Sequence, residues 1–253
     1  MVEFSDNLFE VKRAEDLPVD ALQKAMREHT YACIRGIISE GEVRSALRVI
    51  EENFDQRKDH PTMGQAPSAV RSNFQILKVG GESAAGNNDD ARLFRTFYNP
   101  LWEEDIYSMH GPLTKLARVR NVIADLPSDF AMTKIEANGL WTAARFHQYP
   151  AGGGFFRRHT DYVVNDLAEE HSTKFYQVVL TMTQKGEHYQ EGGAFVDIDG
   201  ERIFLDDQSR PGDILIYDGR TLHGVEDIDP RKPLDLTTLN GRLAGFVTLY
   251  KQM

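Results

Sequence analysis

Residues 140–161 read LWTAARFHQYPAGGGFFRRHTD: a ten-residue β-prone run, a turn rich in Pro and Gly, a second short run and the triplet His159-Thr160-Asp161. Gly, Pro, Asn and Asp residues separate further runs of this kind on both sides of the stretch. Many short strands with this punctuation indicate an all-β sandwich or barrel. We therefore predict a β core over residues 127–253. Its β-prone runs are residues 130–137, 140–149, 174–183, 193–199, 202–207, 213–218 and 244–251.

The first half of the chain shows helical patterning. Residues 17–30 and 98–126 have apolar side chains at helical spacing, and residues 31–35 read as a short strand between helices. Ser39 and Glu42 have the spacing of a capping box, in which each side chain accepts a hydrogen bond from a backbone N–H group at a helix start. We predict a second helix directly after Ser39.

Two polar stretches interrupt this half. Residues 59–73 and 80–90 are rich in small and polar side chains, so we predict loops there and regard them as candidate lids. No internal repeat and no obvious linker divides the chain. We therefore predict one domain over residues 1–253, in which a helical and mixed part, residues 1–126, packs on the β core.

Composition narrows the classes of function. The chain has 253 residues, of which 41% are hydrophobic and 27% charged, as in an ordinary globular protein. Its formal net charge of −10 weighs against a nucleic-acid partner, because such binding needs a basic surface. No apolar run approaches the roughly 20 residues that span a bilayer, so we expect no membrane partner.

The single cysteine, Cys33, cannot form an intramolecular disulfide, and the N-terminal residues lack the basic-then-apolar order of a signal peptide. The cytoplasm is the default location. The sequence carries no pattern that indicates an oligomeric state.

A possible metal-ligand set is the most informative feature. In a strand, residues two apart point to the same face, so His159 and Asp161 can reach one metal ion. About one His-x-acid triplet is expected by chance in this composition, and the alternative is a surface histidine beside a charged neighbour. His223 follows the β-prone run 213–218, and it could also be a packed core residue. Two histidines and one carboxylate together suit Fe(II) and leave coordination positions open.

Arg242 starts the last β-prone run. A buried arginine on a strand is costly unless it binds an anion, and its planar fork can hold a carboxylate through two hydrogen bonds. The alternative is an edge-strand arginine whose guanidinium lies in water.

The order of these features resembles the Fe(II)/2-oxoglutarate-dependent dioxygenases, namely His-x-Asp, a distal His and an Arg on the last strand. Residues 149–156, YPAGGGFF, are similar to the approach to the first histidine in the prolyl-hydroxylase-like branch. Residues 192–195, GGAF, and residues 211–213, PGD, resemble the family's Gly-Gly strand start and Gly-Asp turn. The resemblance covers residues 141–250.

The resemblance implies a mainly β fold, with a double-stranded β-helix (jelly roll) core and flanking helices. It implies that His159, Asp161 and His223 bind Fe(II), and that Arg242 grips the distal carboxylate of 2-oxoglutarate. Tyr149 matches a position that lines the cosubstrate pocket, and Thr181 matches more loosely a position facing the same carboxylate. The family often has Arg-x-Ser on the last strand, whereas this chain has Arg242-Leu243-Ala244, so Thr181 or Tyr149 would supply the second anchor.

The function implied is oxidation of a C–H bond of a small molecule with O₂, by hydroxylation, desaturation or cyclisation, with release of succinate and CO₂. The Asp161 carboxylate favours this over halogenation, because halogenating relatives have Gly or Ala there. Strand alternation makes Arg145, His147 and Arg157 candidates for substrate contacts. Two alternatives remain open at this stage. One is hydroxylation of a protein side chain, and the other is a cupin-like metal-binding protein without oxygenase activity.

Overall fold

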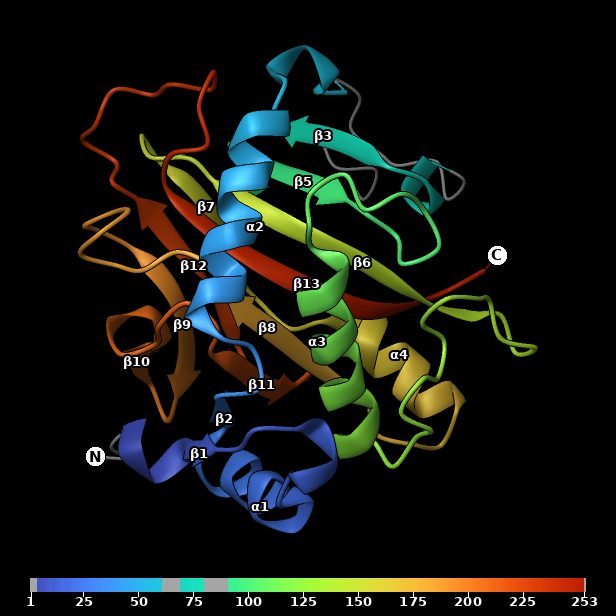
Figure 1. Cartoon of the computed structure of the whole chain (residues 1–253). Helices are drawn as coiled ribbons and strands as arrows, with labels where there is room; N and C mark the ends of the chain where they lie inside the picture. The colour runs from blue at the N-terminus through green and yellow to red at the C-terminus, as the bar shows by residue number, and fades with distance from the viewer. Residues whose placement is uncertain (1–3, 61–68, 80–90, 253) are drawn as a thin grey trace.

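The chain forms two sheets that face each other. The computed structural model describes residues 4–60, 69–79 and 91–252 (Figure 1). Within these residues, one sheet has eight strands in the order β1-β2-β11-β8-β13-β6-β5-β3, and the other has five in the order β10-β9-β12-β7-β4. The strands of the larger sheet are β1 (Leu8–Glu10), β2 (Tyr31–Arg35), β3 (Phe74–Lys78), β5 (Phe94–Tyr98), β6 (Leu140–Tyr149), β8 (Tyr176–Thr181), β11 (Ile214–Asp218) and β13 (Arg242–Lys251). Those of the smaller sheet are β4 (Ala91–Arg92), β7 (Gly154–His159), β9 (Gly193–Ile198), β10 (Glu201–Phe204) and β12 (His223–Ile228).

From β6 onward the chain passes back and forth between the two sheets. β6, β8, β11 and β13 lie in the larger sheet, whereas β7, β9, β10 and β12 lie in the smaller one. Apart from the parallel pair β1–β2, the strands pair antiparallel. This is the double-stranded β-helix expected from the resemblance, so the predicted fold class is confirmed.

Four α-helices accompany the sheets in the described residues. They are α1 (Val19–His29), α2 (Glu40–Asn53), α3 (His110–Ile123) and α4 (Tyr162–Glu170). Figure 1 shows α2 and α3 in front of the larger sheet, and α3 packs against β6, β8 and β13. Short 3-10 helices occupy Phe4–Asn7, Ala14–Asp16, Gln56–Lys58, Ala69–Arg71 and Leu205–Asp207. No helix in the described ranges is long and apolar enough to cross a membrane.

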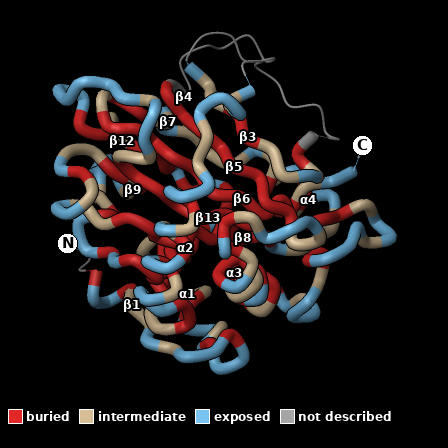
Figure 2. Tube along the Cα trace, turned by 45° about the horizontal axis from the view of Figure 1, so that its top comes forward, coloured by how far each residue is buried: buried red, intermediate tan, exposed pale blue. Residues whose placement is uncertain are grey.

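Strand alternation divides the larger sheet between two cores. Val178 and Leu180 of β8 pack with the helices in the largest apolar cluster. Val179, which lies between them, packs with Phe246 and with Val196 of the smaller sheet. Because successive side chains of a strand point to opposite faces, one strand serves both layers. β6, β8 and most of β13 are consequently buried (Figure 2).

The capping box is present at the start of α2. The Glu42 N–H donates to the Ser39 hydroxyl over 3.2 Å, and the Ser39 N–H donates to the Glu42 carboxylate over 2.9 Å. The prediction of a second helix directly after Ser39 is confirmed. The strand predicted at residues 31–35 is β2, which pairs with β11 of the predicted β core.

Two secondary-structure predictions are wrong. Tyr98 belongs to a strand, because β5 pairs with β3 and β6 on its two sides, and the helix predicted over 98–126 is limited to α3. Residues 130–137 form turns, since Ala131 has a left-handed φ of 56° and the Phe130 carbonyl accepts a hydrogen bond from Asn121 of α3. Most of the two candidate lids, residues 61–68 and 80–90, lies outside the described residues.

Candidate functional site

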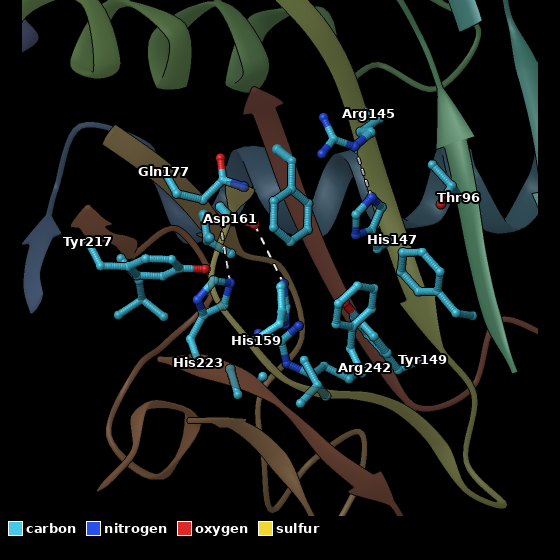
Figure 3. Close-up of a pocket in the computed structure, with 18 of the residues that line it drawn as sticks. Thr96, Arg145, His147, Tyr149, His159, Asp161, Gln177, Tyr217, His223 and Arg242 are labelled. Carbon is cyan, nitrogen blue, oxygen red and sulfur yellow. Dashed lines mark hydrogen bonds and ion pairs between the residues drawn. The ribbon is translucent and has the colours of Figure 1, made fainter. Parts of the chain in front are cut away.

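Three side chains converge at one end of the β7–β12 pair in the smaller sheet. His159 ends β7, His223 begins β12, and the two are paired across the ladder. Asp161 is the residue before α4. His159 Nε2 lies 3.5 Å from Asp161 Oδ1, and His223 Nε2 lies 3.6 Å from Asp161 Oδ2. One ligand atom from each of the three lies within 4.8 Å of the others, so the set predicted from sequence is assembled in space (Figure 3).

Backbone carbonyl groups orient both imidazoles. His159 Nδ1 donates to the Arg157 carbonyl over 2.8 Å, and His223 Nδ1 donates to the Thr221 carbonyl over 2.9 Å. With its proton on Nδ1, each ring directs the Nε2 lone pair toward Asp161. Asp161 Oδ2 is buried and has no hydrogen-bond partner among the described residues. Two imidazole nitrogens and an under-satisfied carboxylate form a donor set that fits a divalent transition metal.

The protonation states agree with this role. Burial would raise the pKa of Asp161, but the neighbouring imidazoles of His159 and His223, which are protonated in the pH range where this carboxyl titrates, and the Arg145 charge outweigh it, so this pKa lies below the usual range. Burial lowers the pKa of His223 more than the Asp161 charge raises it. Asp161 is therefore ionised and His223 neutral at neutral pH, which are the forms that bind metal.

A pocket of about 340 Å³ contains the three residues and extends between the two sheets. Aromatic side chains form much of its wall, namely Phe94, Tyr98, Tyr149, Phe156, Tyr217, Phe246 and Tyr250. Of the other residues singled out from sequence, Arg242, Arg145 and His147 also line it. This volume lies in the range of small-molecule sites.

Arg242 is buried at the start of β13 and is paired with Asp206. Its Nε donates to Asp206 Oδ2 over 2.6 Å, and its Nη2 lies 3.3 Å from Oδ1. Asp206 Oδ2 also accepts from the Tyr189 hydroxyl at 2.6 Å and from the Ala194 N–H at 2.7 Å. Burial raises the pKa of Asp206, but the Arg242 charge and these donors reverse the shift and leave the pKa below its usual value.

The predicted cosubstrate residues lie around Arg242. Tyr149 faces it across the ladder, with its ring centroid 5.5 Å from the guanidinium carbon. Burial raises the pKa of Tyr149, so its phenol is protonated and can donate. Arg242 contacts Asp206 through Nε and Nη2, and the Tyr149 ring lies beside the same guanidinium. Thr181 is buried on β8 outside the pocket lining, and its hydroxyl has no hydrogen-bond partner among the described residues.

The strand alternation assumed for β6 holds, and that assumed for β7 does not. Arg145, His147 and Tyr149 share the pocket face of β6, as expected. The β7–β12 register shifts between the pairs His159–His223 and Phe156–Val225. This bulge turns Phe156 into the pocket and leaves Arg157 exposed and outside the lining, so the expectation that Arg157 shares the face of His159 is wrong.

Two pocket residues and the partner of Arg242 were not found from sequence. Gln177 alternates with Val179 and Thr181 on β8, a signal that was available. Lys78 lies at the end of β3, beside a stretch with no helix or strand pattern. Asp206 is brought to Arg242 from 36 residues away in the chain, and no local pattern marks that pairing.

Known structures share the architecture. A prolyl hydroxylase from Trichoplax adhaerens, solved with a fragment of the hypoxia inducible factor oxygen degradation domain, matches with a TM-score of 0.56 and 9% identity over 90% of this chain and 88% of that chain. A Pseudomonas putida prolyl-4-hydroxylase matches with a TM-score of 0.53 and 15% sequence identity, over 90% of this chain and 97% of that chain. The non-heme α-ketoglutarate-dependent epimerase SnoN from nogalamycin biosynthesis matches with a TM-score of 0.54 and 12% sequence identity, over 92% of this chain and 82% of that chain.

No protein-family model and no curated protein sequence matches this chain. At 9–15% identity, these structures establish a shared fold alone. The chain therefore has the double-stranded β-helix fold of prolyl hydroxylases and of an α-ketoglutarate-dependent epimerase, with a His–Asp–His group in its pocket.

Proposed function

We propose that this chain is a non-haem oxygenase that uses Fe(II), 2-oxoglutarate and O₂ to oxidise a C–H bond of a small molecule. The observation that carries the proposal is the convergence of His159, Asp161 and His223 in a pocket of this fold. Fe(II) and 2-oxoglutarate together supply the oxidising chemistry from O₂ and release succinate and CO₂.

Each part of the pocket has a role in this proposal. His159, Asp161 and His223 would hold the metal, and the backbone carbonyls behind the imidazoles keep the Nε2 atoms directed at it. Arg242 would receive the distal carboxylate of 2-oxoglutarate on Nη1, because Asp206 already occupies Nε and Nη2. The Tyr149 phenol would be the second donor. Thr181 could serve only through a shift of the chain, since it lies outside the lining.

The pocket supports a small-molecule substrate. Its volume of about 340 Å³ has to hold the cosubstrate and the reacting part of the substrate, and aromatic rings surround that space. Rings such as Phe156 and Tyr217 would exclude water from the space beside His159, Asp161 and His223, which would suppress side reactions. A protein side chain is the alternative substrate, and the addition of one oxygen to a peptide, seen by mass spectrometry, would reveal it.

The test is an anaerobic titration of the metal-free protein with Fe(II) and then 2-oxoglutarate, followed by visible absorbance. Chelation of both should produce a weak metal-to-ligand charge-transfer band. We expect no band in Asp161→Ala. In Arg242→Lys, which keeps a charge beside Asp206, the band should require about tenfold more 2-oxoglutarate, because an ammonium group cannot replace the guanidinium fork.

The titration of the wild-type protein tests the proposal itself. If Fe(II) binds and 2-oxoglutarate produces no band, the oxygenase assignment fails and a cupin-like metal protein replaces it. If the band forms, Fe(II)-dependent succinate release in air should follow, and His159→Ala should abolish it. A thermal unfolding curve for each variant separates loss of binding from loss of fold.

A further inference from the structure

A second buried arginine faces the pocket without a carboxylate partner among the described residues. The Arg145 side chain, on β6, is 7% exposed. Its Nε donates to His147 Nε2 over 3.0 Å, Nη1 to the Ala143 carbonyl over 2.9 Å, and Nη2 to the Thr248 hydroxyl over 3.0 Å. A guanidinium has five N–H groups, so one on each terminal nitrogen is left without a described acceptor.

His147 adds another unused donor beside it. Because its Nε2 accepts from Arg145, the ring is neutral and carries its proton on Nδ1. Burial, with the Arg145 charge next in importance, holds the pKa of His147 well below its usual value, which agrees with a neutral ring. The residue is 8% exposed and lines the pocket, and its Nδ1 has no hydrogen-bond partner among the described residues.

Gln177 is oriented to present a donor as well. The Thr248 hydroxyl receives a hydrogen bond from Arg145 and donates to Gln177 Oε1 over 3.0 Å. This fixes the amide so that Nε2, which donates to none of the described residues, belongs to the pocket side (Figure 3). Arg145, His147 and Gln177 therefore offer N–H groups that await an acceptor.

The charges of the pocket also favour an anionic ligand. Among its described lining residues, Asp161 is the only carboxylate, and it belongs to the metal group. Lys78 and Arg145 both line the pocket. Burial lowers the pKa of Lys78, and the Arg145 charge lowers it further. Arg242 differs from Arg145 because Asp206 neutralises it.

The two arginines are also separate in space. In the β6–β13 ladder, Arg145 faces Phe246 and Tyr149 faces Arg242, so the two arginines are four ladder positions apart. That spacing corresponds to about 13 Å along the strands. The Arg145 guanidinium also lies on the side away from Arg242, because it contacts the Ala143 carbonyl and the Thr248 hydroxyl, whereas Arg242 contacts Asp206. The two guanidinium groups therefore face different ligand positions.

We propose that Arg145, His147 and Gln177 form a second anion site, which binds the carboxylate of an organic-acid substrate. The role of this carboxylate as the substrate's rests on the proposed function, in which Arg242 serves the cosubstrate. The Phe246 and Tyr250 rings, 5.5 and 5.4 Å from the Arg145 guanidinium carbon, suit an aryl or other apolar body attached to the carboxylate.

The probes are 3-phenylpropanoate and its neutral amide, measured by calorimetry on the full chain loaded with Zn(II), with and without 2-oxoglutarate. We expect the acid to bind wild type at least about tenfold more tightly than the amide. Arg145→Met should abolish this preference, and Arg145→Lys should retain part of it. Equal binding of acid and amide, no binding of the acid, or an unchanged preference in Arg145→Met would overturn the proposal.

The same variants distinguish substrate from cosubstrate. In the Fe(II) absorbance titration, Arg145→Met should change 2-oxoglutarate affinity by less than about threefold. A loss as large as that in Arg242→Lys would assign the site to 2-oxoglutarate and overturn the substrate role. If wild type shows no charge-transfer band, the proposed function fails, and the preference for acid over amide still decides whether the anion site exists.

Arg48→Met is the matched control. Arg48 is exposed on α2 and its guanidinium contacts Ser45 of the same helix. This substitution removes the same charge and should leave the preference for the acid unchanged. A decrease as large as that in Arg145→Met would mean that net charge alone drives binding, which would overturn the proposal.

Discussion

The two ends of the pocket each hold a buried arginine, in opposite electrostatic situations. Arg242 is paired with Asp206, and Tyr189 adds a hydrogen bond to the same carboxylate. Arg145 contacts a neutral imidazole, a carbonyl and a hydroxyl. Equal burial therefore does not imply an equal role. A charge that already has a counter-ion is held in position by the protein, whereas an uncompensated one is poised for an anionic ligand.

The largest effect is expected when the Arg242–Asp206 ion pair is broken. Arg242→Met leaves Asp206 buried without its counter-ion, so we expect a loss of about 3–5 kcal/mol in the free energy of unfolding. Urea denaturation of the metal-free protein measures it. The double variant Arg242→Met/Asp206→Asn should recover much of the loss. A single variant within about 1 kcal/mol of wild type would contradict the pairing.

A smaller effect on stability should depend on pH. The pKa of Asp206 lies below its unfolded value of 3.8, so its contribution to stability is full well above that value and is lost as pH falls through the lower folded pKa. Asp206→Asn keeps a hydrogen-bond acceptor and removes the charge. At pH 7 we expect it to be about 2 kcal/mol less stable than wild type.

Below about pH 4 this difference should narrow, because the wild-type carboxylate becomes protonated. Urea midpoints of the two proteins from pH 7 to pH 3 measure it. A difference that stays constant with pH would show that the charge of Asp206 contributes nothing, and that shape alone matters at this position.

The smallest effect on stability is expected at Arg145, which has no carboxylate partner among the described residues. Arg145→Met removes a buried charge that has no described counter-ion, and the released desolvation cost offsets the lost hydrogen bonds. We expect a change of less than about 1 kcal/mol, measured by the same urea titration without anions. A loss as large as that in Arg242→Met would reveal a carboxylate partner and would remove the contrast between the two ends.

Much of the site could be predicted from sequence. His159 and Asp161 are two residues apart in the chain, so their side chains come close together even though β7 ends at His159 and Asp161 precedes α4. β6 is a regular ten-residue strand, and alternation therefore placed Arg145, His147 and Tyr149 correctly on one face. Short β-prone runs with turn residues between them indicated the β core for the same reason, since the signals are local.

Other features depended on contacts that no local pattern encodes. A bulge in β7 reversed the phase expected for Arg157. Pairing with β3 and β6 made the segment ending at Tyr98 a strand, although its continuation has helical spacing. A hydrogen bond from Asn121 helps hold residues 130–137 in turns. In each case a neighbour distant in sequence decided the conformation.

Local patterns in the sequence were enough to predict the close pair His159 and Asp161 and most of the short strands, because strand periodicity and turn residues act over a few positions. Which arginine is neutralised depended on the tertiary structure. Asp206 and Arg242 are 36 residues apart and meet only when β13 and the segment after β10 pack together. The charge state of a buried group depends on everything that surrounds it in space, and that environment exists only after the two sheets have closed.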